Sequence, residues 1–190
     1  MLNKKYIQVL RDQILGYAVK RREVIKIAGD AQHHAKRAIF AFQRDDKTAG
    51  EESLRMANGL LTELNKKFKG ERALFEEGAY LAATEEYVES YLFHQFWAGK
   101  ELGKVVGLLV DADTYIGGLC DLPGELYRYA IKSATAKNFA MVEKCYNTSE
   151  EIIGELMNMD LTGYNRNKFD QAKGALHKLE QVVYEVSLRK

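Results

Sequence analysis

Two short acidic pairs in the middle of the chain carry the residue types best suited to chemistry. Glu86 and Glu89 occur in ATEEYVES, and Asp121 and Glu125 occur in CDLPGELYR. The spacings i,i+3 and i,i+4 place both members of a pair on one face of a helix. Carboxylates from two helices suit a hard cation such as Mg²⁺, which can activate water and stabilise charge on a phosphodiester. If the two pairs meet in space, they form a candidate metal-dependent active site.

Both pairs also have a purely structural interpretation. Glu86 and Glu89 could lie on an exposed acidic helix face, and Glu125 could pair with Arg128, three residues later. Residues 71–125 contain eleven acidic side chains against three basic ones. Like charges one helical turn apart repel each other, and a bound cation would remove that repulsion. The spacing alone leaves both interpretations open.

A basic stretch near the N-terminus is the second candidate site. Residues 1–70 carry 15 Lys and Arg against 8 Asp and Glu, whereas residues 71–190 carry 13 against 19. This asymmetry indicates either a basic binding surface beside an acidic site or two helix faces that pair with each other. The side chains that could follow a phosphate backbone without reading its sequence are those of Lys20, Arg21, Arg22, Lys26, His33, Lys36 and Arg37.

Several common kinds of site are excluded by missing motifs. The chain has no CxxC, no GxxxxGK[ST] and no GxGxxG, which argues against zinc ribbons, P-loops and Rossmann sites. The Glu-x-x-His motif of di-iron helical bundles is also missing. No apolar run is long enough for a membrane span, and the charged N-terminal segment does not resemble a signal peptide. Cys120 and Cys145 lie in helical sequence, so we expect reduced core thiols and a cytoplasmic setting.

The elements that position these groups are predicted to be helices. Apolar residues recur at i, i+3, i+4 and i+7 along most of the chain, and alternating strand patterns are missing. We predict an all-α fold, a seven-helix antiparallel bundle forming one domain over residues 1–190. Pro123 indicates a kink, or a first helical turn capped by Asp121. The predicted helices cover residues 3–45, 49–68, 71–98, 101–109, 114–134, 138–159 and 166–188.

Three segments resemble the translin family. They are GDAQHHAKRAIFAFQR, CDLPGELYRYAIKSATAKNF and KLEQVVYEVSLR, and the most specific part is the Asp-Leu-x-Gly-Glu-Leu-x-Arg pattern that begins at Asp121. The resemblance implies the seven-helix fold and closed hollow oligomers that hold RNA inside, here expected to be homo-oligomers. Translin itself binds single strands and lacks the full acidic set, whereas the translin-associated factor X branch carries it.

The resemblance to the factor X branch implies a role for each acid. Glu86 and Glu89 match the Glu-x-x-Glu pair of that branch, and Asp121 and Glu125 match its Asp-x-x-x-Glu pair. These pairs form a Mg²⁺-dependent endoribonuclease site in the branch. The chain departs from the family at Pro123, where the family often has Thr, in carrying an extra acid just before Glu86, and in being shorter than the animal members.

The expected function is therefore a Mg²⁺-dependent endoribonuclease acting on single-stranded RNA. The four acids would be the catalytic residues and metal ligands, and Mn²⁺ could replace Mg²⁺. Single-stranded DNA is a further candidate ligand. Two alternatives stay open: a non-catalytic oligomer that binds single-stranded RNA or DNA, and a helical scaffold that contacts only protein.

Overall fold

The computed structural model describes residues 1–188. Within that range the chain forms seven helices and no strand, which confirms the predicted all-α fold. The helices are α1 (Lys4–Phe42), α2 (Lys47–Lys67), α3 (Arg72–Phe75), α4 (Gly78–Trp97), α5 (Ala112–Thr135), α6 (Phe139–Met157) and α7 (Gly163–Ser187).

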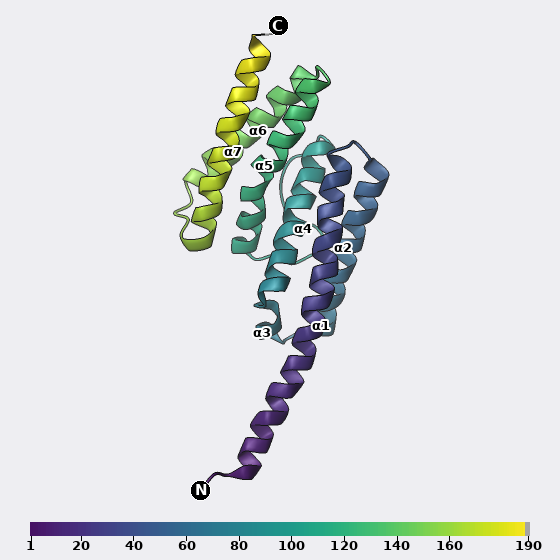
Figure 1. Cartoon of the computed structure of the whole chain (residues 1–190), viewed down its shortest axis with the longest axis vertical. Helices are drawn as coiled ribbons and strands as arrows, with labels where there is room; N and C mark the ends of the chain where they lie inside the picture. Colours follow the sequence, from purple (N-terminus) through teal and green to yellow (C-terminus); the bar gives the residue numbers. More distant parts are fainter. Residues whose placement is uncertain (189–190) are drawn as a thin grey trace.

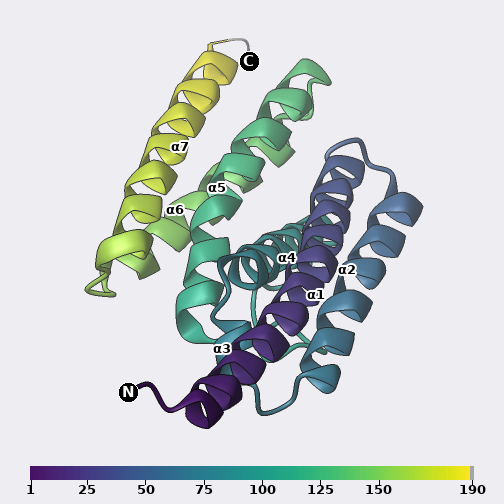
Figure 2. The ribbon, with the colours of Figure 1, turned by 60° about the horizontal axis from the view of Figure 1, so that its bottom comes forward.

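The helices form two groups that meet mainly where α4 packs against α5. In the first group α1 packs against α2 and α4, and in the second α5 packs against α6 and α7 (Figure 1). The contact between α4 and α5 joins the groups. In Figure 2 this contact lies in the middle of the molecule, with α2 and α7 on opposite sides. Side chains at the α4–α5 contact are therefore surrounded by other helices.

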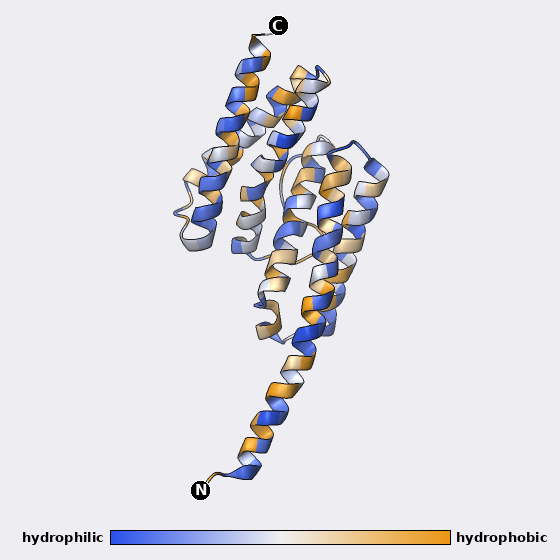
Figure 3. Ribbon diagram, viewed as in Figure 1, coloured by the Kyte–Doolittle hydropathy of each residue, from blue (hydrophilic) through white to orange (hydrophobic). Residues whose placement is uncertain are grey.

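Helix α1 has two parts with different surroundings. Its N-terminal part extends beyond the other helices (Figure 1), and apolar and charged residues both lie along it (Figure 3). The apolar side chains exposed there include those of Tyr6, Val9, Ile14, Leu15 and Val19. Beyond it a row of small residues is fully buried and lets the neighbouring helices approach closely: Ala28, Ala31, Ala35 and Ala38.

Capping residues set the start of two helices earlier than predicted. The Asp46 carboxylate accepts a hydrogen bond of 3.1 Å from the Ala49 amide, so α2 begins at Lys47. The Asp111 carboxylate accepts bonds from the Thr114 amide (2.9 Å) and hydroxyl (2.7 Å), so α5 begins at Ala112. In each case a side-chain oxygen satisfies an amide that has no partner within the first helical turn.

The helix predicted over residues 71–98 is divided into α3 and α4. The break falls at Glu77, whose backbone is extended at φ −64° and ψ 130°. Its carboxylate accepts hydrogen bonds from Tyr17 Oη at 2.8 Å and Arg21 Nε at 2.7 Å. The chain therefore turns at Glu77 and contacts α1 instead of continuing as one helix.

The helix predicted over residues 101–109 is wrong, because this segment is an irregular loop. Gly99 and Gly107 have φ angles of 69° and 89°, in the left-handed region that breaks a right-handed helix. The loop nevertheless buries Val105 and Leu108 in the core. The apolar pattern at 101–109 thus reflects a buried loop, which periodicity alone does not distinguish from a short helix.

Helix α5 continues through Pro123, so Asp121 and Glu125 lie one turn apart on the same helix. The interpretation of Asp121 as a helix cap is therefore wrong. Two glycines before Asp121 let α5 lie directly against α4. A Cβ atom added at Gly117 would lie 2.0 Å from Glu85 Oε2, and one added at Gly118 would lie 2.8 Å from the Glu85 carbonyl oxygen.

The two cysteines are free and buried, as predicted. Burial raises the pKa of Cys120 to about 11 and that of Cys145 to about 12, so both stay protonated thiols at neutral pH. None of the helices within residues 1–188 has an apolar stretch long enough to cross a membrane.

Candidate functional site

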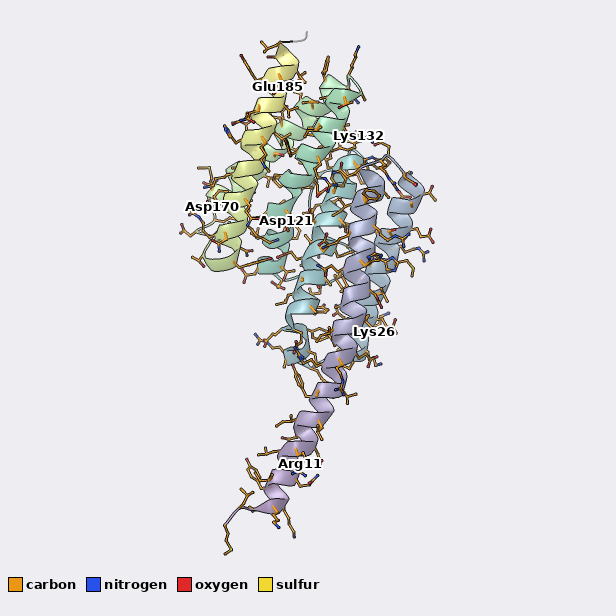
Figure 4. The ribbon with its side chains drawn as sticks, viewed as in Figure 1. Arg11, Lys26, Asp121, Lys132, Asp170 and Glu185 are labelled. Atoms are coloured by element: carbon orange, nitrogen blue, oxygen red, sulfur yellow. The ribbon has the colours of Figure 1, made fainter. Side chains whose placement is uncertain are left out.

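The four predicted acids lie on α4 and α5, the two helices that connect the two groups of helices. Glu86 and Glu89 project from α4, and Asp121 and Glu125 from α5. Asp121 lies where α5 passes between α4 and α7 (Figure 4). Burial raises the pKa of Glu89 well above its usual range, and the neighbouring charges of Asp121, Glu86 and Glu125 raise it further. The structure thus brings all four carboxylates into one electrostatic cluster around Glu89.

Glu89 is the buried centre of this cluster. Among residues 1–188 it is the one Asp, Glu, Lys or Arg that is buried in the core, with 8% of the residue exposed. No hydrogen bond or ion pair from residues 1–188 reaches its carboxylate. The Glu89 oxygens are not among the fully buried polar atoms without a partner, so they keep some contact with solvent. A largely buried carboxylate without a protein donor is still unfavourable, because it loses much of its hydration. Glu89 therefore lacks a cationic or hydrogen-donating partner.

The acids on either side of Glu89 do have partners. Burial raises the pKa of Glu86, while Lys36, with Nζ 3.5 Å from Glu86 Oε2, partly lowers it. Glu125 accepts two hydrogen bonds from Arg128 Nη1, at 2.9 and 3.0 Å. A third bond, of 2.9 Å, comes from Gln43 Nε2 at the end of α1.

Asp121 pairs with Lys168 of α7. The Lys168 ammonium contacts Asp121 Oδ2 and also lies 2.7 Å from Oε1 of Glu85. Burial raises the pKa of Asp121, and the hydrogen bond and charge of Lys168 oppose that increase. Tyr164, one turn before Lys168, donates a 2.8 Å hydrogen bond to the same Glu85 oxygen. The cluster therefore extends from α4 and α5 to α7.

Sequence reasoning missed Lys168, Tyr164 and Gln43 as members of this site. The only signal for the extension was Glu85, an extra acid next to Glu86. Lys168 is an ordinary polar position in an amphipathic helix, and its partners lie far away along the chain. Only the packing of α7 on α5 brings it to Asp121.

The donors present fit a hard divalent cation in their chemistry. Carboxylate oxygens are the ligands that Mg²⁺ and Mn²⁺ prefer, and Glu89 lacks a partner that such an ion would supply. Within residues 1–188, however, no three Asp, Glu, His or Cys side chains are arranged to hold one metal ion. Glu86, Asp121 and Glu125 are instead ion-paired with Lys36, Lys168 and Arg128. Metal coordination requires at least some of these ion pairs to open.

Three of the seven predicted phosphate-contacting residues are paired with acids of other helices. Lys20 Nζ lies 2.7 Å from Glu71, and Arg21 Nε lies 2.7 Å from Glu77. Lys36 contacts Glu86, as described above. These three side chains therefore pair with the acidic half of the chain, which was the alternative to a phosphate-binding surface.

The other four basic side chains form an exposed row. Arg22, Lys26, His33 and Arg37 are exposed, and residues 1–188 offer them no ion pair within 4.0 Å. Their spacing of four, seven and four residues keeps them on one face of α1. We call these four residues the basic row. Lys36, the residue before Arg37, contacts Glu86 and so lies between the basic row and the acid cluster.

Comparison with known proteins identifies the family. Residues 19–190 match the sequence profile described as the Translin family. The chain belongs to the translin family. This translin-family chain is 26% identical over 165 residues to an uncharacterized protein of Methanocaldococcus jannaschii, covering 83% of this chain and 72% of that protein. It is 28% identical over 92 residues to translin of Gallus gallus, covering 48% of this chain and 40% of translin.

Solved structures similar to this translin-family chain share its fold. The crystal structure of apo-NeC3PO has a TM-score of 0.86 at 18% identity, and the match covers 98% of each chain. The structure of an AfC3PO–duplex RNA complex has a TM-score of 0.85 at 23% identity, covering 97% of this chain and 98% of that chain. At these identities the similarity establishes the arrangement of helices.

Proposed function

We propose that this translin-family protein is a Mg²⁺-dependent endoribonuclease of the factor X type that acts on single-stranded RNA. The observation that carries the proposal is the buried Glu89 carboxylate, which has three further carboxylates around it and no donor within residues 1–188. Such an arrangement is unfavourable without a cation. It also combines the acids that the sequence matches to a nuclease site.

Each part of the site would have its own role. Glu86, Glu89, Asp121 and Glu125 would hold the ion, directly or through its waters. A bound divalent ion would supply an activated water and stabilise negative charge on the scissile phosphate. Gln43 orients the Glu125 carboxylate through its 2.9 Å hydrogen bond, and the surrounding helices keep Glu89 away from bulk water. Mn²⁺, with similar ligand preferences, would replace Mg²⁺.

RNA binding would depend on the basic row of α1. Its exposed charges can follow phosphates without reading a base sequence. The similar AfC3PO structure contains duplex RNA, which supports RNA as the ligand class. We further propose assembly into a homo-oligomer, supported by the apolar side chains that are exposed along the N-terminal part of α1. Single-stranded DNA would bind the same charges.

The test is cleavage of end-labelled single-stranded RNA by the purified protein, with Mg²⁺ and with EDTA. We expect internal cleavage only with Mg²⁺, and little cleavage of a duplex of the same sequence. Glu89→Gln and Asp121→Asn should abolish cleavage while RNA retention on a gel persists. Glu63→Gln is the matched control, because Glu63 is an exposed acid on α2.

Wild-type protein that retains RNA but leaves it intact in Mg²⁺ and in Mn²⁺ would overturn the nuclease proposal. That result would favour the second candidate, a non-catalytic RNA- or DNA-binding oligomer. One observation favours this candidate: the ion pairs of Lys168 and Arg128 satisfy two of the four acids without a metal. A protein that retains neither RNA nor DNA at low salt would contradict both candidates.

A further inference from the structure

Lys168 is the most buried cation in the acid cluster. Its side chain is 12% exposed, whereas those of Lys36 and Arg128 are 59% and 57% exposed. Charges exposed to that extent are screened by water and salt, and a buried charge is screened much less. Among these three cations Lys168 therefore has the strongest electrostatic effect on the carboxylates beside it.

The position of Lys168 is fixed by groups outside the four predicted ligands. Glu85 Oε1 lies 2.7 Å from its ammonium, and the Tyr164 hydroxyl donates to the same oxygen at 2.8 Å. The Tyr164 ring centre lies 5.3 Å from Lys168 Nζ. The Glu85 side chain reaches this place across Gly117, where a Cβ atom would collide with its carboxylate. The chain thus holds Lys168 with an acid that the metal site does not need.

Asp121 is shared between this arrangement and the proposed metal site. Its Oδ2 atom contacts the Lys168 ammonium, and its charge acts on Glu89. An ammonium and a divalent cation cannot both take the same carboxylate oxygen without strong mutual repulsion. Lys168 contacts Oδ2 only, so a metal at Asp121 would compete with the ammonium for Oδ2 or would bind Oδ1 and be repelled by the ammonium beside it.

We propose that Lys168 is a tethered cation that competes with the divalent metal for Asp121 and thereby sets the metal affinity of the site. When the metal binds, Asp121 releases Lys168, and Glu85 retains it. In the metal-free protein Lys168 offsets part of the negative charge of the cluster, which helps the fold to hold five neighbouring carboxylates together. The inference rests on the proposed metal-dependent function and makes Lys168 a positioning residue that acts through Asp121.

The competition predicts opposite effects for two substitutions. Lys168→Met removes the competing charge, so Mn²⁺ should bind more tightly. A charge within ion-pair distance changes the proton affinity of a carboxylate by about tenfold or more, and we expect a change of that order in Mn²⁺ affinity. Glu85→Gln leaves Lys168 to Asp121 alone, so Mn²⁺ should bind more weakly. Lys168→Arg keeps the charge and should stay within about threefold of wild type.

The experiment is titration of the full-length protein with Mn²⁺, following the free ion by electron paramagnetic resonance. Circular dichroism checks that each variant is folded. Lys173→Met is the matched control, because Lys173 lies on the same helix and pairs with Asp170 at 2.6 Å, away from the cluster. This control should leave the Mn²⁺ affinity unchanged.

The possible results separate the inference from the proposed function. Wild type that binds Mn²⁺ while Lys168→Met binds it equally or less tightly would overturn the competition and leave the metal site in place. Weaker binding by Glu85→Gln together with tighter binding by Lys168→Met would support it. If Lys168→Met does not fold, unchanged or tighter binding by Glu85→Gln would overturn it. No Mn²⁺ binding by wild type or by any variant would overturn the metal-dependent function itself.

Discussion

Gln43 holds Glu125 with two hydrogen bonds from a single amide nitrogen. Its Nε2 atom donates to the Glu125 carbonyl oxygen at 2.8 Å and to Oε2 at 2.9 Å. Gln43 is 8% exposed and lies directly after α1, so these bonds connect the end of α1 to the middle of α5. The nearby turn is fixed by Asp45, which has a φ of 61° and accepts hydrogen bonds from Tyr129 and Trp97.

We predict that Gln43→Ala destabilises the protein. The substitution removes one donor from the Glu125 carbonyl oxygen and one from the carboxylate, which keeps its bonds to Arg128, at a cost of about 1–2 kcal/mol. Urea denaturation measures the change. Gln13→Ala, at an exposed position of α1, is the control and should be neutral. An equal effect of the two substitutions would show that the bonds to Glu125 contribute nothing to stability.

The glycines of α5 give a graded prediction. Gly118→Ala places a Cβ 2.8 Å from the backbone oxygen of Glu85, so α4 and α5 must move apart, at a cost of about 1–3 kcal/mol. Gly117→Ala meets the flexible end of Glu85 and should mainly break its contacts with Lys168 and Tyr164. Gly124→Ala has no atom within 4 Å and should raise stability by up to about 1 kcal/mol.

Thermal unfolding and Mn²⁺ titration together check the glycine series. Gly118→Ala should have the lowest melting temperature of the three variants. Gly117→Ala should change the Mn²⁺ affinity even if its melting temperature falls only slightly. If Gly124→Ala is the least stable variant, the close contact between α4 and α5 is not what these glycines provide.

Glu89 gives a pH-dependent prediction for the metal-free protein. Its pKa is raised in the folded state above the ordinary value of 4.5, so the folded protein binds this proton more tightly than the unfolded chain. Above the raised pKa the buried charge therefore destabilises the fold, and the penalty disappears as the pH falls toward 4.5. Glu89→Gln in EDTA should melt several degrees higher than wild type near pH 8.

The advantage of Glu89→Gln should shrink steadily as the pH is lowered to 4.5. Added Mg²⁺ should stabilise wild type and leave the variant largely unaffected, because a ligand that binds only the folded state raises its stability. Glu63→Gln, on the exposed surface, should show neither effect. A melting temperature of Glu89→Gln below that of wild type at pH 8 in EDTA would contradict the prediction.

The basic row gives a prediction about salt dependence. Replacing Lys26 or Arg37 by Ala should weaken RNA binding and lower the slope of log K against log salt by about one for each phosphate that is no longer neutralised. Lys20→Ala should change the slope less, since Lys20 is already neutralised by Glu71 at 2.7 Å. Binding measured at several salt concentrations tests both expectations. A larger effect for Lys20 would place the RNA elsewhere on the protein.

Much of this fold follows from local sequence signals. Apolar periodicity located most of the helices, and the i,i+3 and i,i+4 spacings correctly put each acidic pair on one helix. The loop at residues 101–109 was misassigned because Val105 and Leu108 are buried without a helix, while Gly107 breaks the helical backbone. In that segment apolar residues are buried although no helix forms, so an apolar pattern there indicates burial and does not indicate a helix.

The members of the site that were missed depend on contacts between distant helices. Lys168 reaches Asp121 only because α7 packs on α5, and Gln43 reaches Glu125 only because the turn after α1 meets that helix. Helical spacing carries no information about either contact. It revealed the acids, which are adjacent on their own helices, and the Arg128 partner of Glu125, but not the partners that come from other helices.

The site also depends on the absence of a Cβ atom at Gly117. Gly117 has no reactive group, yet the space of its missing Cβ is where the Glu85 carboxylate lies. In a mutational scan scored by activity at limiting metal, substitutions at this position should therefore have an effect through the metal affinity, although nothing in the chemistry of glycine would mark it. A search for functional residues that considers only side chains would overlook the position that lets five of them meet.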